Sequence, residues 1–156
     1  YSLNENIKKM DFFRYLILYE FGGIYSDMDF IPNKRIDENI FNNYNFLGYK
    51  ASRDRKLSKS DGYKYYNYDN DGVWTLGQAF FACNRNNENL IDLINDIIVN
   101  KFDVKDPLLH TGPEKINQIF FLNKKLLHEY TYIFSKKDMA NQHGNVGYHK
   151  QSHNWN

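Results

Sequence analysis

Cysteine, proline and long apolar runs are scarce in this chain of 156 residues, and neither sign of charge is in excess. The single cysteine, Cys83, excludes an internal disulfide framework and a zinc site built from several cysteines. With 20 basic and 19 acidic residues the formal net charge is +1, so a general attraction to nucleic acid or to an anionic membrane is not indicated. No apolar run approaches the about 20 residues that span a bilayer, and no signal-peptide pattern is present. We therefore expect neither a nucleic-acid partner nor a membrane segment in this chain, and local groups must bind any anionic ligand.

The composition is nevertheless that of a folded protein. Hydrophobic residues make up 42% of the chain and charged residues 25%, which is sufficient for one globular domain with a core. We expect a single domain over residues 1–156. The chain begins at Tyr1, almost directly at a predicted helix start, so it can be an N-terminally truncated piece of a longer protein.

Helices and strands are predicted to alternate along the chain. Helical patterns cover residues 3–19, 33–41, 87–102 and 111–127, and strand patterns cover residues 23–27, 45–50, 73–83 and 130–134. Residues 51–72 form a polar segment rich in turn residues, and the tail over 136–156 is predicted to be irregular. Alternation with short strands predicts an α/β sandwich with a mixed or parallel sheet.

The most informative segment begins on the first predicted helix. Asp11 and Arg14 stand three positions apart, so they share one face of a helix that is otherwise mostly apolar. One interpretation is a local ion pair with a structural role. The other is a pair of functional groups, an acceptor and a forked donor, able to hold a ribose or the edge of a base.

A second polar group follows the turn at Gly22-Gly23. Residues 23–27 are predicted to form a short buried strand, and strand side chains alternate, so Tyr25, Asp27 and Asp29 project to one side while the extended conformation lasts. Two carboxylates and a phenol then converge. The Asp-x-Asp pattern alone carries little weight, because Asp69-Asn70-Asp71 repeats it in the polar segment.

Carboxylates at the end of a strand suit metal-assisted chemistry on a diphosphate. Their hard oxygens suit Mg²⁺ or Mn²⁺, which keep open positions for substrate phosphates, and ligands of α/β sheets bind at the carboxyl ends of the strands. A phosphohydrolase of the haloacid-dehalogenase kind, with Asp27 as nucleophile, is an alternative. That group expects Thr or Val after the second Asp, where this chain has Phe30.

The run Asp11-x-x-Arg14, then Gly22-Gly23-Ile24-Tyr25-x-Asp27-x-Asp29, closely resembles the glycosyltransferases with the DXD sugar-binding motif. These family 32-like enzymes include α-mannosyltransferases, and they are related to α1,4-galactosyltransferases, capsular polysaccharide transferases and clostridial glucosylating toxins. The resemblance implies a GT-A-like α/β fold with a mixed or parallel sheet flanked by helices. The family's opening strand and helix have no counterpart before Tyr1.

Weaker similarities continue along the chain. Gln78-Ala79-Phe80 is similar to the family's Asn-Ala-Phe segment, with Gln in place of Asn. Thr111-Gly112-Pro113 resembles a Gly-Pro turn before a late helix. His149 with Trp155 resembles a closing His…Ser-Trp element, although Asn154 precedes the tryptophan here.

The resemblance also implies an activity and a set of roles. The activity is metal-dependent transfer of a hexose, with retention of configuration, from a UDP- or GDP-sugar donor to a glycan or other hydroxyl acceptor. Asp27 and Asp29 would be the catalytic residues and would hold Mn²⁺ or Mg²⁺, Asp29 directly and Asp27 through water. The donor-binding residues would be Asp11, Arg14, Tyr25, Asp27, Gln78, His149 and Trp155. Besides the phosphohydrolase, a non-catalytic nucleotide-sugar-binding module is the remaining alternative.

Overall fold

The computed structural model describes residues 3–52, 67–70, 72–99, 110–122, 130–139 and 145–149. The helices in these ranges are α1 (Leu3–Phe21), α2 (Glu38–Asn43), α3 (Glu88–Val99), α5 (Pro113–Leu122) and α6 (Lys136–Met139). The strands are β1 (Gly23–Ser26), β2 (Phe30–Pro32), β3 (Phe46–Ser52), β4 (Asn67–Asp69), β5 (Gly72–Leu76), β6 (Phe80–Cys83), β7 (Thr131–Phe134) and β8 (Gly147–His149).

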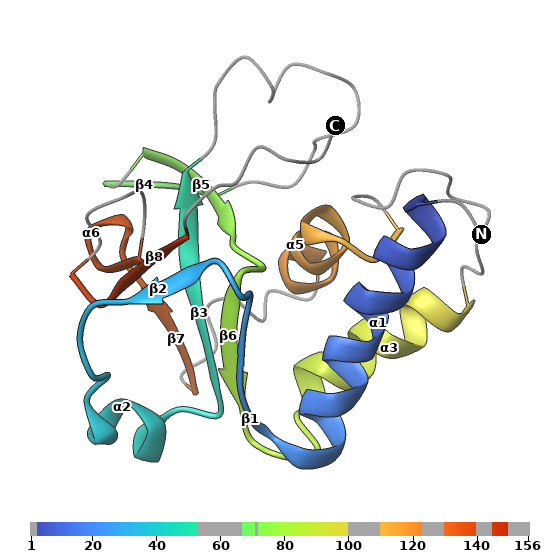
Figure 1. Ribbon diagram of the computed structural model, residues 1–156, viewed down its shortest axis with the longest axis horizontal. Coiled ribbons are helices and arrows are strands. Elements are labelled where there is room, and N and C mark those ends of the chain that lie inside the picture. The colour runs from blue at the N-terminus through green and yellow to red at the C-terminus, as the bar shows by residue number, and fades with distance from the viewer. Residues whose placement is uncertain are drawn as a thin grey trace.

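A mixed sheet forms the centre of the fold (Figure 1). Its strand order is β1-β6-β3-β5-β4, and β7 pairs with β3. The β3–β7 pair is parallel, whereas β1–β6, β3–β6, β3–β5 and β4–β5 are antiparallel. Strands β2 and β8 form a separate antiparallel pair. The predicted α/β fold with a mixed sheet is therefore confirmed.

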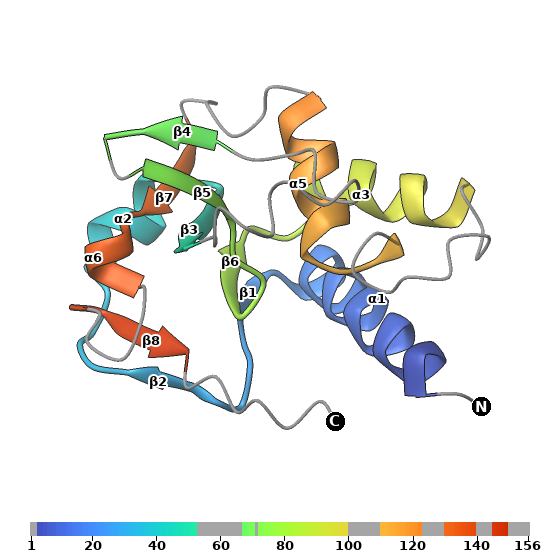
Figure 2. The same cartoon turned by 90° about the horizontal axis from the view of Figure 1, so that it is seen from above.

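Helices and the β2–β8 pair cover the two faces of the sheet (Figures 1 and 2). On one side α1, α3 and α5 pack over side chains such as Phe46 and Phe81, and on the other α6 and the β2–β8 pair pack near Leu47 and Phe80. Neighbouring residues of β3 and β6 thus enter opposite cores, as alternation along a strand requires. Cys83 lies buried in the first core, as a packing residue.

Gly22 ends α1 and sets the entry to β1. Its φ is +67°, in the left-handed region that favours glycine at a helix end, and its N–H donates to the Leu18 carbonyl at 2.8 Å. A Cβ at this position would lie 2.6 Å from the main-chain nitrogen of Arg85. The turn therefore needs glycine for its conformation and also for its close packing.

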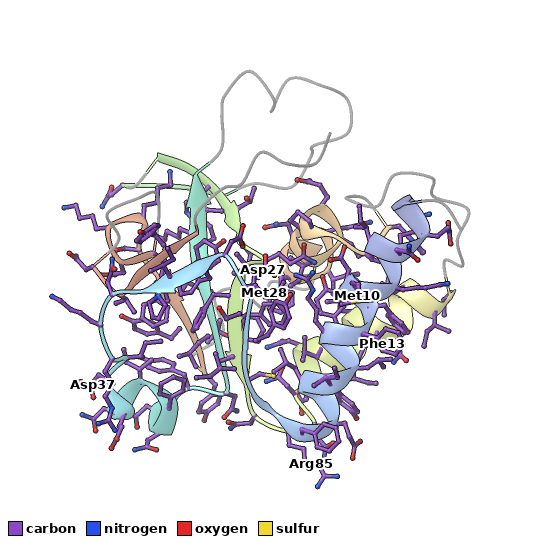
Figure 3. All side chains as sticks on the ribbon, in the orientation of Figure 1. Met10, Phe13, Asp27, Met28, Asp37 and Arg85 are labelled. Atoms are coloured by element: carbon purple, nitrogen blue, oxygen red, sulfur yellow. The ribbon has the colours of Figure 1, made fainter. Side chains whose placement is uncertain are left out.

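Helix α1 buries one face only. Its opposite face exposes four large apolar side chains, Met10, Phe13, Ile17 and Phe21, each more than half accessible to solvent. Figure 3 labels Met10 and Phe13 on this helix. The helix is therefore less buried than its mostly apolar composition predicts. No helix in the described ranges is both long and apolar enough to cross a membrane.

Several predicted boundaries differ from the structure. The expected strand over residues 73–83 is two strands, β5 and β6, which residues 77–79 separate. The helix expected over 33–41 begins later and ends later, as α2, and the polar segment contains β4. The tail is not wholly irregular, because α6 and β8 form within it. Strand β1 is mostly exposed rather than buried, since it is the end strand of the sheet.

Candidate active site

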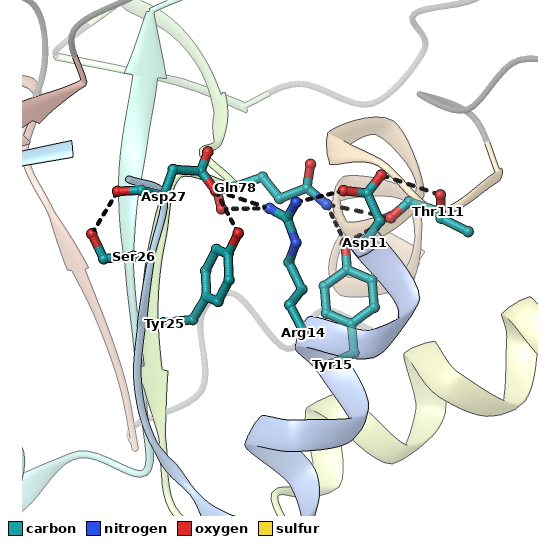
Figure 4. Close-up of polar contacts among 8 residues, drawn as sticks. All are labelled: Asp11, Arg14, Tyr15, Tyr25, Ser26, Asp27, Gln78 and Thr111. Atoms are coloured by element: carbon teal, nitrogen blue, oxygen red, sulfur yellow. Dashed lines mark hydrogen bonds and ion pairs between the residues drawn. The ribbon is translucent and has the colours of Figure 1, made fainter. Parts of the chain in front are cut away.

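Arg14 is the centre of the polar cluster that lies between α1 and the end of β1 (Figure 4). Its Nη2 is 2.8 Å from Asp11 Oδ1, one helical turn away, and its Nη1 is 3.4 Å from Asp27 Oδ1. The side chains of Arg14 and Asp11 are only 13% and 7% exposed. A guanidinium can donate to two carboxylates at once because its N–H groups form a rigid fork. The two segments singled out in the sequence therefore meet at one arginine.

Tyr25 completes the cluster from the strand side. Its hydroxyl donates to Asp27 Oδ1 at 2.6 Å, and its ring lies 4.5 Å from the Arg14 guanidinium carbon in a cation–π contact. Tyr25 and Asp27 thus lie on the same side of the chain, as the alternation of a strand predicts. The predicted association of Asp11, Arg14, Tyr25 and Asp27 is observed.

Asp29 does not continue this alternation. The strand ends at Ser26, and residues 27–29 form a turn, which we call the acidic turn, closed by a hydrogen bond from Phe30 N–H to the Asp27 carbonyl at 3.0 Å. Met28 at its tip is fully exposed (Figure 3), whereas Asp27 and Asp29 are half-buried. The expectation that an extended strand aligns both carboxylates is therefore wrong, because both carboxylates lie on a turn.

Residues far apart in the sequence close the other side of the cluster. Thr111, just before α5, donates its hydroxyl to Asp11 Oδ2 at 3.2 Å, and its carbonyl accepts from the Tyr15 hydroxyl at 2.7 Å. The Gln78 side-chain amide donates to Tyr15 and to the Thr111 carbonyl. The Gln78 carbonyl accepts from Arg14 Nη1 at 3.4 Å. Both the main-chain carbonyl and the side-chain amide of Gln78 thus belong to the cluster, and the amide is hydrogen-bonded to Tyr15.

Burial and neighbouring charges change the pKa of Asp11. Burial raises the pKa of Asp11 to about 6, although Arg14 and the Thr111 hydroxyl lower it, and the negative charge of Asp27 adds to the rise. Perturbed carboxylates of this kind gather at functional sites, although structural ion pairs produce them too. Asp11 is thus partly protonated in weakly acidic solution.

The two phenols of the cluster stay protonated at neutral pH. Burial raises the pKa of Tyr15, and the neighbouring Asp11 charge adds to this rise. Burial also raises the pKa of Tyr25, and its hydrogen bond to Asp27 has the same direction. Both hydroxyls therefore serve as hydrogen-bond donors rather than as bases.

Tyr15 and Thr111 were not identified from the sequence as site residues. A tyrosine in a mostly apolar helix is a usable signal, because its hydroxyl requires a partner when it is buried. The partner itself could not be found that way, since Thr111 lies 96 positions away.

The remaining predicted residues lie near the end of the chain. His149 is in β8, where its main chain pairs with Phe30, directly after the acidic turn. The main chain of β8 therefore lies next to the acidic turn. Trp155 lies outside the described residues.

The acidic turn has the donor chemistry of a site for Mn²⁺ or Mg²⁺. Within the described ranges no group of three His, Cys, Asp or Glu side chains could hold a metal ion by itself. Ions of this type are commonly bound by one or two carboxylates, with water and substrate phosphates completing the shell. Asp27 and Asp29 supply two such carboxylates, so the residues present fit an ion that is held together with a diphosphate.

Comparison with known proteins agrees with the motif. Residues 1–47 match the family described as a glycosyltransferase sugar-binding region containing a DXD motif. This match confirms the resemblance to that family over these residues. The mixed sheet flanked by helices is consistent with a GT-A-like fold.

A curated relative makes the comparison more specific. Over 38 residues the chain is 53% identical to the initiation-specific alpha-1,6-mannosyltransferase of Candida albicans. The match covers 24% of this chain and 10% of that relative. The likeness is therefore strong but local.

Proposed function

We propose that this chain carries the donor site of a metal-dependent, retaining glycosyltransferase. The donor is a nucleoside-diphosphate sugar, with UDP or GDP as the nucleotide, and the transferred group is a hexose. The acceptor is a hydroxyl group of a glycan or of another molecule. The family match and the alpha-1,6-mannosyltransferase relative support this proposal.

The single observation that carries the proposal is the position of Arg14. Its side chain is mostly buried, it contacts Asp11 and Asp27, and its Nε is buried without a hydrogen-bond partner in the described part of the chain. A buried N–H group without a partner costs about 1–3 kcal/mol. A hydroxyl group of the nucleotide sugar could accept a hydrogen bond from Arg14 Nε. We therefore infer that a ligand binds beside Arg14.

The chain's own residues then have defined tasks. Asp11 and Arg14 bind the hydroxyl groups of the donor, as an acceptor and a donor of hydrogen bonds. Tyr25 is proposed to line the ribose or base of the donor, and its hydroxyl donates a hydrogen bond to Asp27. Gln78, His149 and Trp155 are proposed as further donor-binding residues. Tight orientation of this kind is a large part of catalysis by transferases.

Asp29 and Asp27 are the residues that would hold Mn²⁺ or Mg²⁺. When bound, such an ion stabilises the negative charge that accumulates on the departing diphosphate. Asp11 and Asp27 are ion-paired with Arg14, and Asp29 is assigned to the cation, so no carboxylate of the cluster is assigned as a covalent nucleophile. We therefore propose retention by attack of the acceptor on the face from which the diphosphate departs.

A thermal-shift panel tests the proposal. UDP- and GDP-sugars are added with and without Mn²⁺, and a ligand at about 100 times its Kd should raise Tm by roughly 5–10 °C for a chain of this size. Asp29→Asn should remove the Mn²⁺-dependent part of the shift. Asp69→Asn is the matched control, because it alters the second Asp-x-Asp pattern of the sequence, at residues 69–71.

The outcomes separate the alternatives. No shift with any nucleotide sugar, with or without Mn²⁺, would contradict the proposal. A shift without turnover would indicate a non-catalytic binding module. Hydrolysis of p-nitrophenyl phosphate that Asp27→Asn abolishes would favour the phosphohydrolase instead.

A further inference from the structure

The connector between β5 and β6, residues 77–79, joins the site to the sheet through its main chain. The Gly77 N–H donates to the Tyr49 carbonyl at 2.9 Å, and the Ala79 carbonyl accepts from Asp27 N–H at 2.8 Å. Between them, the Gln78 carbonyl accepts from Arg14. Three consecutive residues thus contact β3, α1 and the acidic turn. Displacement of this connector would move Arg14 and Asp27 relative to each other.

Tyr49 of β3 packs directly against the connector. Its side chain is 6% exposed and belongs to the same core cluster as Ala79. A Cβ on Gly77 would lie 2.0 Å from Tyr49 Cζ, the ring carbon that carries the hydroxyl. Glycine at position 77 therefore leaves the space that this ring occupies, and the ring in turn limits where the connector can lie.

The Tyr49 hydroxyl reaches the acidic turn through one residue. The main-chain N–H of Ala79 hydrogen-bonds to this hydroxyl, and the carbonyl of Ala79 accepts from Asp27 N–H. Burial raises the pKa of Tyr49, the hydrogen bond from Ala79 lowers it, and the negative charges of the acidic turn raise it further. The hydroxyl is thus protonated at neutral pH, and the carboxylates of the turn are near enough to influence it.

We propose that Tyr49 is a positioning residue for the acidic turn. Its hydroxyl fixes the main chain of Ala79, Ala79 fixes the main chain of Asp27, and the placement of Asp27 and Asp29 for a divalent cation follows from that. Tyr49 itself contacts neither donor nor metal in this scheme. The metal-binding part of this inference rests on the proposed function, whereas the effect on the turn does not.

Amide exchange in the metal-free full chain tests the positioning role directly. Tyr49→Phe removes only the hydroxyl, and exchange of Asp27 N–H, followed by ¹⁵N NMR, should accelerate by roughly 2- to 10-fold, which is what the net contribution of one hydrogen bond represents. Asn84 N–H, which donates to the Asn45 carbonyl, is the internal reference and should keep its rate. Tyr132→Phe is the matched control, because it deletes a half-buried phenol hydroxyl from the neighbouring strand β7.

Cation binding tests the functional consequence. Mn²⁺ is titrated with GDP or UDP present, and free Mn²⁺ is measured by electron paramagnetic resonance. Tyr49→Phe should weaken Mn²⁺ binding by a factor of about 2–10, as expected for one hydrogen bond, while Tyr132→Phe binds as the wild type does.

The possible results decide between the two proposals. Unchanged exchange of Asp27 N–H in Tyr49→Phe overturns the positioning role, and so does equal acceleration of Asp27 and Asn84 or loss of the folded state, because either shows general support of the core. Equal Mn²⁺ affinity of Tyr49→Phe and wild type overturns the link to the cation. Absence of Mn²⁺ binding in the wild type overturns the proposed function instead, and the exchange result then still decides the positioning role.

Discussion

Replacement of Asp11 by Asn should change how the stability of the protein depends on pH. Asp11 is 5% exposed, and burial raises its pKa from 3.8 to about 6 in the folded state. Between these two values the folded protein keeps a proton that the unfolded chain has lost. The contribution to stability is therefore fully present below pH 3.8 and is lost as the pH rises through about 6.

The size of this effect follows from the same shift. A pKa difference of about 2 corresponds to about 3 kcal/mol, of which about 2–3 kcal/mol falls between pH 4 and pH 7.5. Asp11→Asn cannot titrate at this position. The free energy of unfolding of the wild type, minus that of the variant, should therefore decrease by this amount across the pH range.

Urea unfolding of both proteins at several pH values gives the comparison. Asp37→Asn is a suitable control, because it deletes an exposed carboxylate at the N-cap of α2, where Asn caps equally well. A difference that stays constant from pH 4 to pH 7.5, or that increases, would refute the reasoning. It would show that the attraction of Arg14 at 2.8 Å outweighs the cost of burying Asp11.

Three further substitutions test other parts of the structure, each by urea unfolding. Arg14→Ala removes the cation that two carboxylates contact and should cost about 3–5 kcal/mol, with Asp11→Asn in the same chain recovering part of the loss; additive losses would contradict this. Gly22→Ala should lower the free energy of unfolding more than Gly23→Ala does. Both glycines have a positive φ, but only at Gly22 would a Cβ lie against neighbouring main chain. Equal losses would show that this contact relaxes freely. Asn117→Leu should cost about 2–3 kcal/mol, because the buried amide satisfies both main-chain groups of one β5 residue, and an unchanged midpoint would refute that role.

The helices and strands near the site were predictable because their signals are local. The helix over 3–19 is rich in helix-forming residues and ends just before Gly22, where a left-handed conformation is needed. The strand after Gly23 begins where predicted. The pairing of Asp11 with Arg14 was also predictable, since residues three apart on a helix face the same way.

The errors have physical causes that lie outside any short window of sequence. Residues 73–83 resemble one strand because both halves are apolar. The break between the two strands begins at Gly77, where a Cβ would clash with the Tyr49 ring from another strand. A two-residue spacing suits a strand and therefore predicts an extended segment, whereas the hydrogen bond from Phe30 N–H to the Asp27 carbonyl closes residues 27–29 into a turn. The Thr111–Asp11 contact spans 100 positions, and no local pattern encodes it.

The side-chain types and their spacing indicate which groups we propose for the chemistry. Asp11, Arg14, Tyr25, Asp27 and Asp29 were recognisable from their types and spacing, because ionisable side chains in otherwise apolar elements need a reason to be there. How these side chains are held depends on the folded structure. Only folding places one arginine between carboxylates from a helix and a turn and buries Asp11 enough to raise its pKa, because charge interactions and desolvation depend on distances that the chain acquires when it packs.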